Sequence, residues 1–182
     1  MNINMLHVAV SALLLTSVAD IGHAESTGRA PEDSRAAAPT AVLSGGCSDA
    51  NKINYKSDDS INKSTFSSSF VDVPNSAVLF TQGGAVASCV IVTFTAEAFA
   101  PGSRLLQIRA RLDNSVTAAP GNVQLSGDDD EDGDGRWARS QAFTFIFPSV
   151  APGPHNVRMQ FRSPDVFGNV YIHKHTIMVQ HR

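Results

Sequence analysis

The acidic segment Leu125–Ser140, "LSGDDDEDGDGRWARS", contains the residue types that bind calcium. Six carboxylates fall within the seven positions from Asp128 to Asp134. Ca²⁺ takes about six to eight oxygen ligands, and carboxylates at alternate positions of a tight turn can converge on one ion. The segment therefore predicts a calcium loop, and calcium is the cofactor that the sequence suggests. The candidate ligands are Asp128, Asp130, Asp132 and Asp134.

The acidic segment does not form an EF-hand. The pattern D-x-D-x-D-G occurs in two overlapping registers, but the position that holds a bidentate Glu in EF-hands is Arg139 in one register and Gln141 in the other. A looser calcium loop and a solvated hairpin tip both stay open as interpretations. Neighbouring like charges repel in water, so in either case the order of the segment should depend on salt or on a cation.

A set of basic residues follows two segments in which apolar and polar residues alternate, "RLLQIRARLD" at 104–113 and "HNVRMQFRS" at 155–163. If these segments pair in one sheet, their arginines share one outer surface with Gln107 and Gln160, and a lysine of the last strand could join them. Arginine forks match the carboxylates or sulfates of an anionic glycan. The alternatives are an ordinary charged face that keeps the sheet soluble, and neutralisation by the acidic segment. The candidate ligand-binding residues are Arg109, Arg111, Arg158, Arg162 and Lys174.

The motif "HKH" near the C-terminus has the spacing of metal ligands on a strand. His173 and His175 are two residues apart and would project from the same side, where zinc or copper could bind with His155 or His181 as a third ligand. The apolar residues around the motif change parity, which predicts a β-bulge. Edge-strand histidines without a metal are the alternative.

Signatures of nucleophilic catalysis and of phosphate binding are missing from the sequence. It has no G-x-S-x-G elbow, no Ser or Cys in a recognisable His and Asp context, and no glycine loop followed by the Lys of a phosphate site. The sequence therefore predicts that the protein is not an enzyme.

The elements that must position these residues are β-strands. From about Thr65 onward apolar residues recur with period two, and Gly, Pro, Asn and Asp mark the junctions. The pattern places Phe143, Phe145 and Phe147 on one inward side. We predict an all-β fold over residues 65–182, an antiparallel two-sheet sandwich with immunoglobulin-like topology and the jelly roll as the alternative.

The N-terminal region has the features of an export signal followed by a linker. Met5–Ala19 is apolar and uncharged, and Gly22 and Ala24 supply small residues for cleavage. We expect a signal peptide at residues 1–24, with a retained N-terminal anchor as the alternative, and no membrane span after cleavage. Residues 25–64 are expected to form a linker or disordered tail.

The chain has two cysteines, Cys47 and Cys89. An even number of cysteines in an exported chain predicts a disulfide between them. Such a bond would tie the N-terminal tail to the domain.

The stretch "SVAPGPHNVRMQFRSPDVFGNVYIHKHTIMVQ", Ser149–Gln180, resembles the last strands of bacterial immunoglobulin-like and fibronectin-like domains. The resemblance implies the fold and no activity. The chain departs from the antibody-type pattern, because Cys47 precedes the first expected strand and Trp137 lies beside the acidic segment. The residues that match the turns of those domains are Pro152, Gly153, Val157, Asp165, Gly168 and Asn169.

These observations predict a secreted or periplasmic, non-catalytic binding or structural module. The expected partner is a polysaccharide, in particular an anionic glycan, or a cell-surface protein. A net charge of −3 gives no field that would recruit nucleic acid. The alternatives are a calcium-stabilised adhesion module and a metal-dependent enzyme that uses His173 and His175.

Overall fold

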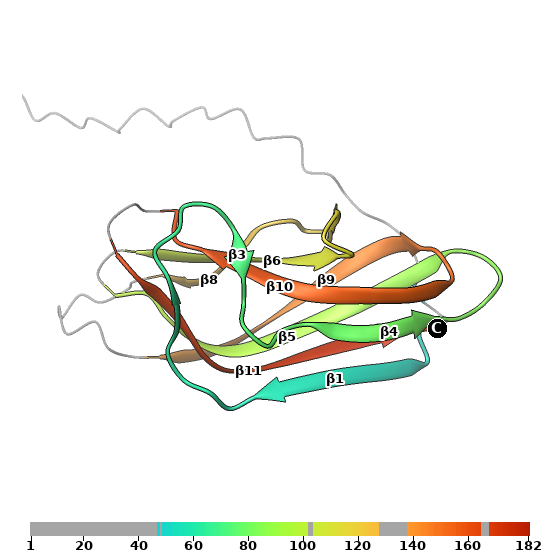
Figure 1. Ribbon diagram of the computed structural model, residues 1–182, viewed down its shortest axis with the longest axis horizontal. Helices are drawn as coiled ribbons and strands as arrows, with labels where there is room; N and C mark the ends of the chain where they lie inside the picture. The colour runs from blue at the N-terminus through green and yellow to red at the C-terminus, as the bar shows by residue number, and fades with distance from the viewer. Residues whose placement is uncertain (1–46, 48, 102–103, 128–137, 165–167) are drawn as a thin grey trace, which may run out of the picture. The chain divides into compact units, whose positions relative to one another are not determined.

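The structure is a computed structural model that describes residues 47, 49–101, 104–127, 138–164 and 168–182. These residues contain no helix, and their strands form two antiparallel sheets (Figure 1). The strands are β1 (Lys52–Asp58), β2 (Lys63–Thr65), β3 (Val71–Asp72), β4 (Val78–Gln82), β5 (Ser88–Phe99), β6 (Leu105–Leu112), β7 (Val116–Thr117), β8 (Val123–Gly127), β9 (Arg139–Val150), β10 (Gly153–Arg162) and β11 (Val170–His181).

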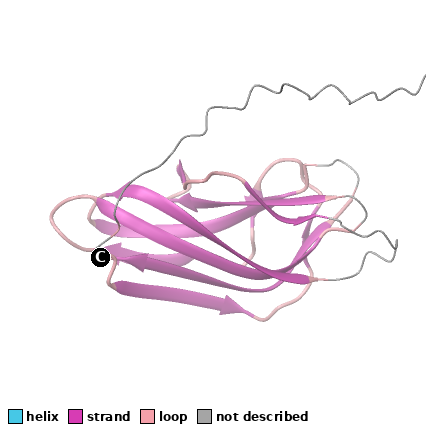
Figure 2. Cartoon of the chain, turned by 180° about the vertical axis from the view of Figure 1, so that it is seen from behind, coloured by secondary structure: helices cyan, strands magenta, loops and turns pink. Residues whose placement is uncertain are grey.

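The two sheets pack face to face as a sandwich, which confirms the predicted fold class. Sheet A has the order β1-β11-β5-β9, with β2 paired to β11, and is seen from the other side in Figure 2. Sheet B has the order β3-β10-β6-β7, with β4 paired to β10 and β8 paired to β6. The connections between consecutive long strands repeatedly cross from one sheet to the other.

The strand order is that of a jelly roll. Strands pair from the two ends of the chain inward, β1 with β11, β4 with β10, β5 with β9 and β6 with β8, and successive pairs belong to different sheets. An immunoglobulin-like domain keeps its last two strands in one sheet, whereas β10 lies in sheet B and β11 in sheet A. The jelly-roll alternative is therefore correct, and the immunoglobulin-like order is not found.

The core lies between the sheets and follows from the alternation of side chains. On β6 every second residue from Leu106 to Leu112 is buried, and the residues between them face outward. Phe94 and Phe145 are fully buried, while Phe143 is half-buried against the core. Full burial of a large apolar side chain contributes about 1.5–3 kcal/mol to stability. Because the inward side chains are fixed by this packing, the residues between them are held on the outer face of each sheet.

The sandwich begins earlier in the chain than predicted. The range 25–64 was expected to be a linker or tail, but β1 lies inside it, β2 begins in it, and both strands pair with β11. Strand β1 forms one edge of sheet A, and its residues are exposed or half-buried. None of its residues is fully buried, so no alternating apolar pattern marks it in the sequence.

The predicted disulfide between Cys47 and Cys89 is present, with a Cα–Cα distance of 5.5 Å. It joins the chain before β1 to the start of β5. The predicted signal peptide at residues 1–24 lies outside the described residues. Within the described ranges, no helix has the length and apolar character needed to cross a membrane.

Candidate functional site

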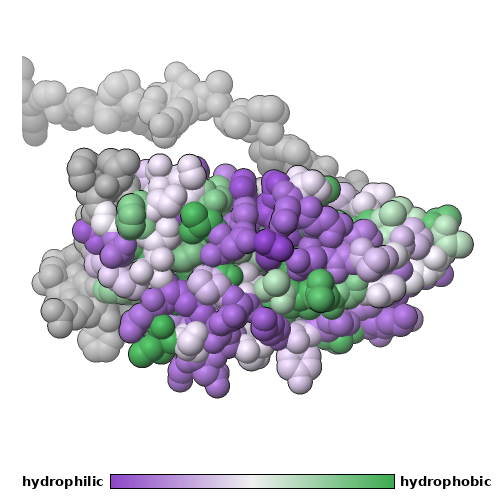
Figure 3. Space-filling view, viewed as in Figure 1, coloured by the Kyte–Doolittle hydropathy of each residue, from purple (hydrophilic) through white to green (hydrophobic). Residues whose placement is uncertain are grey.

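The arginines predicted to share a surface lie together on the outer side of sheet B. Strands β6 and β10 pair as expected, and each of the outward cross-strand pairs contains at least one arginine. Hydrophilic side chains gather over β10 and its neighbours in Figure 3. We call this set the arginine face. Its pairs are Arg111 opposite Arg158, Arg109 opposite Gln160, and Arg162 opposite Gln107.

Two glutamines hold two of the guanidinium groups in place. The Oε1 atom of Gln160 accepts a hydrogen bond from Nε of Arg109 at 2.8 Å. The Oε1 atom of Gln107 accepts from Nε and Nη2 of Arg162 at 3.0 and 2.8 Å. These bonds restrict the rotamers of both arginines, and a restricted fork loses less entropy when it binds an anion.

Phe70, just before β3, is a member of the face that the sequence did not suggest. The guanidinium carbons of Arg109 and Arg162 lie 4.1 and 4.6 Å from the centre of its ring. Cation–π contacts of this kind contribute about 0.5–1 kcal/mol at exposed sites. The ring therefore adds to the positioning of both arginines.

Asp72 on β3 supplies a carboxylate to the arginine face. Its Oδ2 atom lies 2.7 Å from Nη1 of Arg158, and its Oδ1 atom accepts a hydrogen bond from Nε2 of Gln160 at 2.7 Å. Burial alone would raise the pKa of Asp72, but the bonds from Gln160 and Arg158 outweigh it and lower the pKa. Asp72 is therefore ionised at neutral pH and neutralises part of the positive charge.

The positive charge of the face is not fully compensated. Of the four arginines, Arg158 alone forms an ion pair with a described residue, and that residue is Asp72. The Nε atoms of Arg111 and Arg158 are buried without a hydrogen-bond partner. Burial and the neighbouring charges of Arg111 and Arg162 lower the pKa of Arg109, which is the expected sign of crowded positive charge. An anion placed on this surface would relieve that repulsion.

Lys174 does not belong to the arginine face. It lies on β11 of sheet A and is exposed there. The sequence placed it on the final strand correctly, but the jelly-roll order puts that strand in the other sheet. The prediction that Lys174 joins the arginines is therefore wrong.

The predicted bulge in β11 is confirmed, and it separates the two histidines of the "HKH" motif. The pairing register with β5 shifts between Ile172 and His175. His175 is 4% exposed and packs against Phe94, with ring centres 5.5 Å apart, whereas His173 is half-buried. The two imidazoles therefore do not share one side of the strand, contrary to the prediction.

The histidines considered as third metal ligands lie away from His175, near the C-terminal end of β11. His155 and His181 both pack on Phe80, with ring centres 5.6 and 5.0 Å from it. Six residues of extended strand, from His175 to His181, span roughly 20 Å. Within the described ranges, no three His, Cys, Asp or Glu side chains come together in a way that could hold a metal ion.

The predicted calcium ligands Asp128, Asp130, Asp132 and Asp134 lie outside the described residues. The calcium site stays a prediction from sequence.

No family model matches the chain, and no curated protein matches it. Among solved structures, the chain is similar to the C-terminal CBM6 of LamC, a marine laminarinase from Zobellia galactanivorans, with 10% identity, 74% of this chain and 94% of that chain covered, and a TM-score of 0.35. It is also similar to the CBM35 of Abf62 from Cellvibrio japonicus, with 15% identity, coverage of 72% and 99%, and a TM-score of 0.34. A third likeness is to the GH115 4-O-methyl-α-glucuronidase BtGH115A, with 12% identity and a TM-score of 0.38, where 58% of this chain matches and spans 13% of that enzyme. Likenesses at this level add nothing on what this chain binds.

Proposed function

We propose that this protein is an exported, non-catalytic binding module that holds an anionic polysaccharide on its arginine face. The observation that carries the proposal is that two paired strands place four arginines on one outer face. Among the described residues, Asp72 is the one carboxylate that forms an ion pair with them. Planar guanidinium forks pair with carboxylate and sulfate groups through charge-assisted hydrogen bonds. The disulfide between Cys47 and Cys89 supports export, because such bonds persist in oxidising compartments.

The arrangement suits a chain of anionic groups better than a single anion. Arg109 and Arg111 face outward two residues apart on β6, and Arg158 and Arg162 lie on the neighbouring strand. Alternate residues of a strand are about 7 Å apart, so the pair Arg111 and Arg158 and the two arginines on Phe70 follow one another along the sheet. A polymer that carries repeated charges could contact several of these arginines at once.

The proposal is for binding without catalysis. The carboxylate on the face, Asp72, has a lowered pKa and is held by Arg158 and Gln160. A strongly ionised, paired carboxylate is a poor general base, because the favourable pKa of a base lies near the working pH.

The proposal is tested by retention on a column of immobilised sulfated or uronate-containing glycan. The double variant Arg109→Gln, Arg158→Gln removes two charges from the face, and the matched variant Lys52→Gln, Lys56→Gln removes two charges from β1 of sheet A. We expect the arginine variant to bind at least tenfold more weakly, which corresponds to about 1.4 kcal/mol, while the lysine variant keeps its affinity. Equal losses in both variants, or no loss in the arginine variant, would contradict the proposal, provided that thermal melting shows both to be folded.

A further inference from the structure

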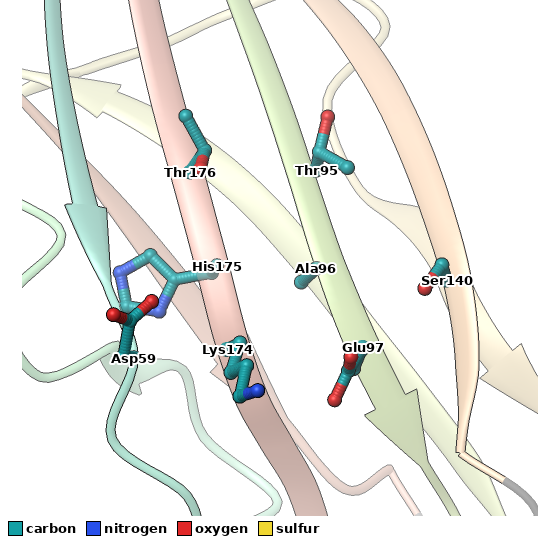
Figure 4. Close-up of a pocket in the computed structure, with 8 residues that line it drawn as sticks. All are labelled: Asp59, Thr95, Ala96, Glu97, Ser140, Lys174, His175 and Thr176. Atoms are coloured by element: carbon teal, nitrogen blue, oxygen red, sulfur yellow. The ribbon is translucent and has the colours of Figure 1, made fainter.

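A small pocket lies beside the bulge of β11 on the outer side of sheet A, away from the arginine face. The pocket has a volume of about 190 Å³ and lies across β11, β5 and the start of β9 (Figure 4). Pockets for drug-sized ligands measure about 300–1,000 Å³, so this one suits a smaller molecule, such as a single sugar unit.

Three charged side chains of mixed sign line the pocket. Lys174 of β11 and Glu97 of β5 lie on neighbouring strands, and Asp59, just after β1, lies on the other side of β11 (Figure 4). Within the described part of the chain, none of the three forms an ion pair or a side-chain hydrogen bond. Their hydrogen-bonding capacity is therefore open to a ligand, and their summed charge is negative.

Hydroxyl groups and an aromatic pair complete the surroundings. Ser140 of β9 lies directly opposite Glu97 and is exposed. Phe99 follows Glu97 by two residues, so it faces the same side of the sheet, and its ring centre lies 5.6 Å from that of Tyr171. The pocket itself is lined by donors and acceptors, and the aromatic pair lies further along the same two strands.

His175 lies at the back of the pocket, with its side chain turned toward the core. Its imidazole is 4% exposed and packs against Phe94. Burial and the charge of Lys63 lower the pKa of His175. The imidazole therefore adds no positive charge at neutral pH, and the negative sum of the three charged side chains persists.

We propose that this pocket binds one protonated amino-sugar unit. The ammonium group pairs with Glu97, and the sugar hydroxyls bond to Lys174 and Ser140. Two carboxylates against one lysine favour a cationic ligand, while the lysine and the serine favour a ligand that also carries hydroxyl oxygens. The site lies on sheet A and does not depend on binding at the arginine face of sheet B.

The inference is tested by NMR titration of the full chain with D-glucosamine, D-glucose and glycine. We expect D-glucosamine to cause saturable shifts in the amides around Glu97 and Lys174. D-glucose should bind at least tenfold more weakly, because it lacks the ammonium group. Glycine, a zwitterion without hydroxyls, should also bind at least tenfold more weakly.

Glu97→Gln keeps the shape of the side chain, removes its charge and should weaken D-glucosamine binding at least tenfold. The matched control is Asp72→Asn, which makes the same chemical change on sheet B and should leave D-glucosamine binding unchanged. The inference would be overturned by the absence of saturable shifts, by equal affinity for D-glucose or glycine, or by equal losses in the two variants.

Discussion

The two outer faces of the sandwich use the same alternation of side chains but satisfy their polar groups in different ways. On sheet B, Gln107 and Gln160 bond the arginines across the strands. On sheet A, short hydroxyls pair across the strands, as between Ser57 and Thr176 at 2.9 Å, and Lys174 and Glu97 at the pocket form no ion pair with a described residue. The difference shows that the outward rows of a sheet can form either a closed network or an open pocket.

The chain around β3 explains much of this difference. It places Phe70 against two arginines and Asp72 against a third, so sheet B has its own internal partners. At the pocket of sheet A, Lys174, Glu97 and Asp59 have no ion-pair partner among the described residues. A ligand at the arginine face therefore competes with contacts that already exist. At the pocket on sheet A, the charged side chains have no such contacts to lose.

Two histidines repeat the contrast. Both ring nitrogens of His155 face acceptors, Oδ2 of Asp113 at 2.7 Å and the carbonyl oxygen of Ala151 at 2.8 Å, which only the protonated imidazole satisfies fully. Both ring nitrogens of His175 lack hydrogen-bond partners. The first environment favours the charged form of histidine and the second favours the neutral form.

The largest expected effect tests whether the two faces belong to one cooperative unit. The disulfide between Cys47 and Cys89 closes a loop with a sequence separation of 42, which includes edge strands of both sheets. Replacing both cysteines by serine should lower the free energy of unfolding by about 4 kcal/mol in the chain-entropy model. Urea unfolding measures the loss. Hydrogen exchange should show that amides of β6 and β11 lose protection together, and a loss limited to one sheet would contradict a single unit.

The histidines should give opposite pH dependences of stability. Burial alone would lower the pKa of His155, but its bonds to Asp113 and Ala151 and the charge of Asp113 raise it. Its stabilising contribution is then complete below the unfolded pKa of about 6.5 and is lost as the pH rises through the folded value. The pKa of His175 is lowered by burial and by Lys63, so its unfolded form binds the proton first and stability falls as the pH drops below about 6.5.

Matched variants separate the two contributions. His175→Phe removes two buried nitrogens whose desolvation costs about 1–3 kcal/mol, so the variant should gain stability, most of all at pH 5.5. His155→Gln should lose stability, and its deficit should shrink as the pH rises. Denaturant unfolding between pH 5.5 and 8 measures both. Parallel curves for wild type and both variants would show that neither histidine differs in pKa between the folded and unfolded states.

The sequence was sufficient to predict the sandwich and the side of each strand on which its arginines lie. Both follow from local rules, because a period of two places Arg109 and Arg111 on one side of a strand whatever the topology. The sheet that receives Lys174 depends instead on the order in which strands pair across the whole chain, and the alternation of a single strand does not determine that order. The same limit applies to Phe70 and Asp72, which meet the arginines from a distant part of the sequence.

The bulge in β11 marks an intermediate case. The change of parity between Ile172 and Ile177 predicted its existence, but the sides taken by His173 and His175 depend on where the extra residue is inserted. Edge strand β1 was missed because none of its residues is fully buried, so its sequence carries no alternating apolar pattern.

The smallest expected effect concerns the like-charged pair Arg111 and Arg158 on the arginine face. Like charges directly opposite on a sheet destabilise it by roughly 0.2–1 kcal/mol, and salt screens this repulsion. Arg111 also donates hydrogen bonds to Thr117 Oγ1 at 2.7 Å and to the carbonyl oxygen of Asn114. Arg111→Gln should therefore change the free energy of unfolding by less than about 1 kcal/mol. The ionic strength decides whether the relieved repulsion with Arg158 exceeds the two lost hydrogen bonds.

The sign of the salt effect makes this variant informative. Relative to wild type, Arg111→Gln should be most stable at low salt, where the relieved repulsion is largest, and should lose that advantage as salt rises. Lys56→Gln on β1 is the matched control, because Lys56 lies opposite the neutral Ile177. Its stability should differ little from that of the wild type, with a smaller salt dependence. If both variants respond to salt equally, the cross-strand repulsion is not specific to the pair.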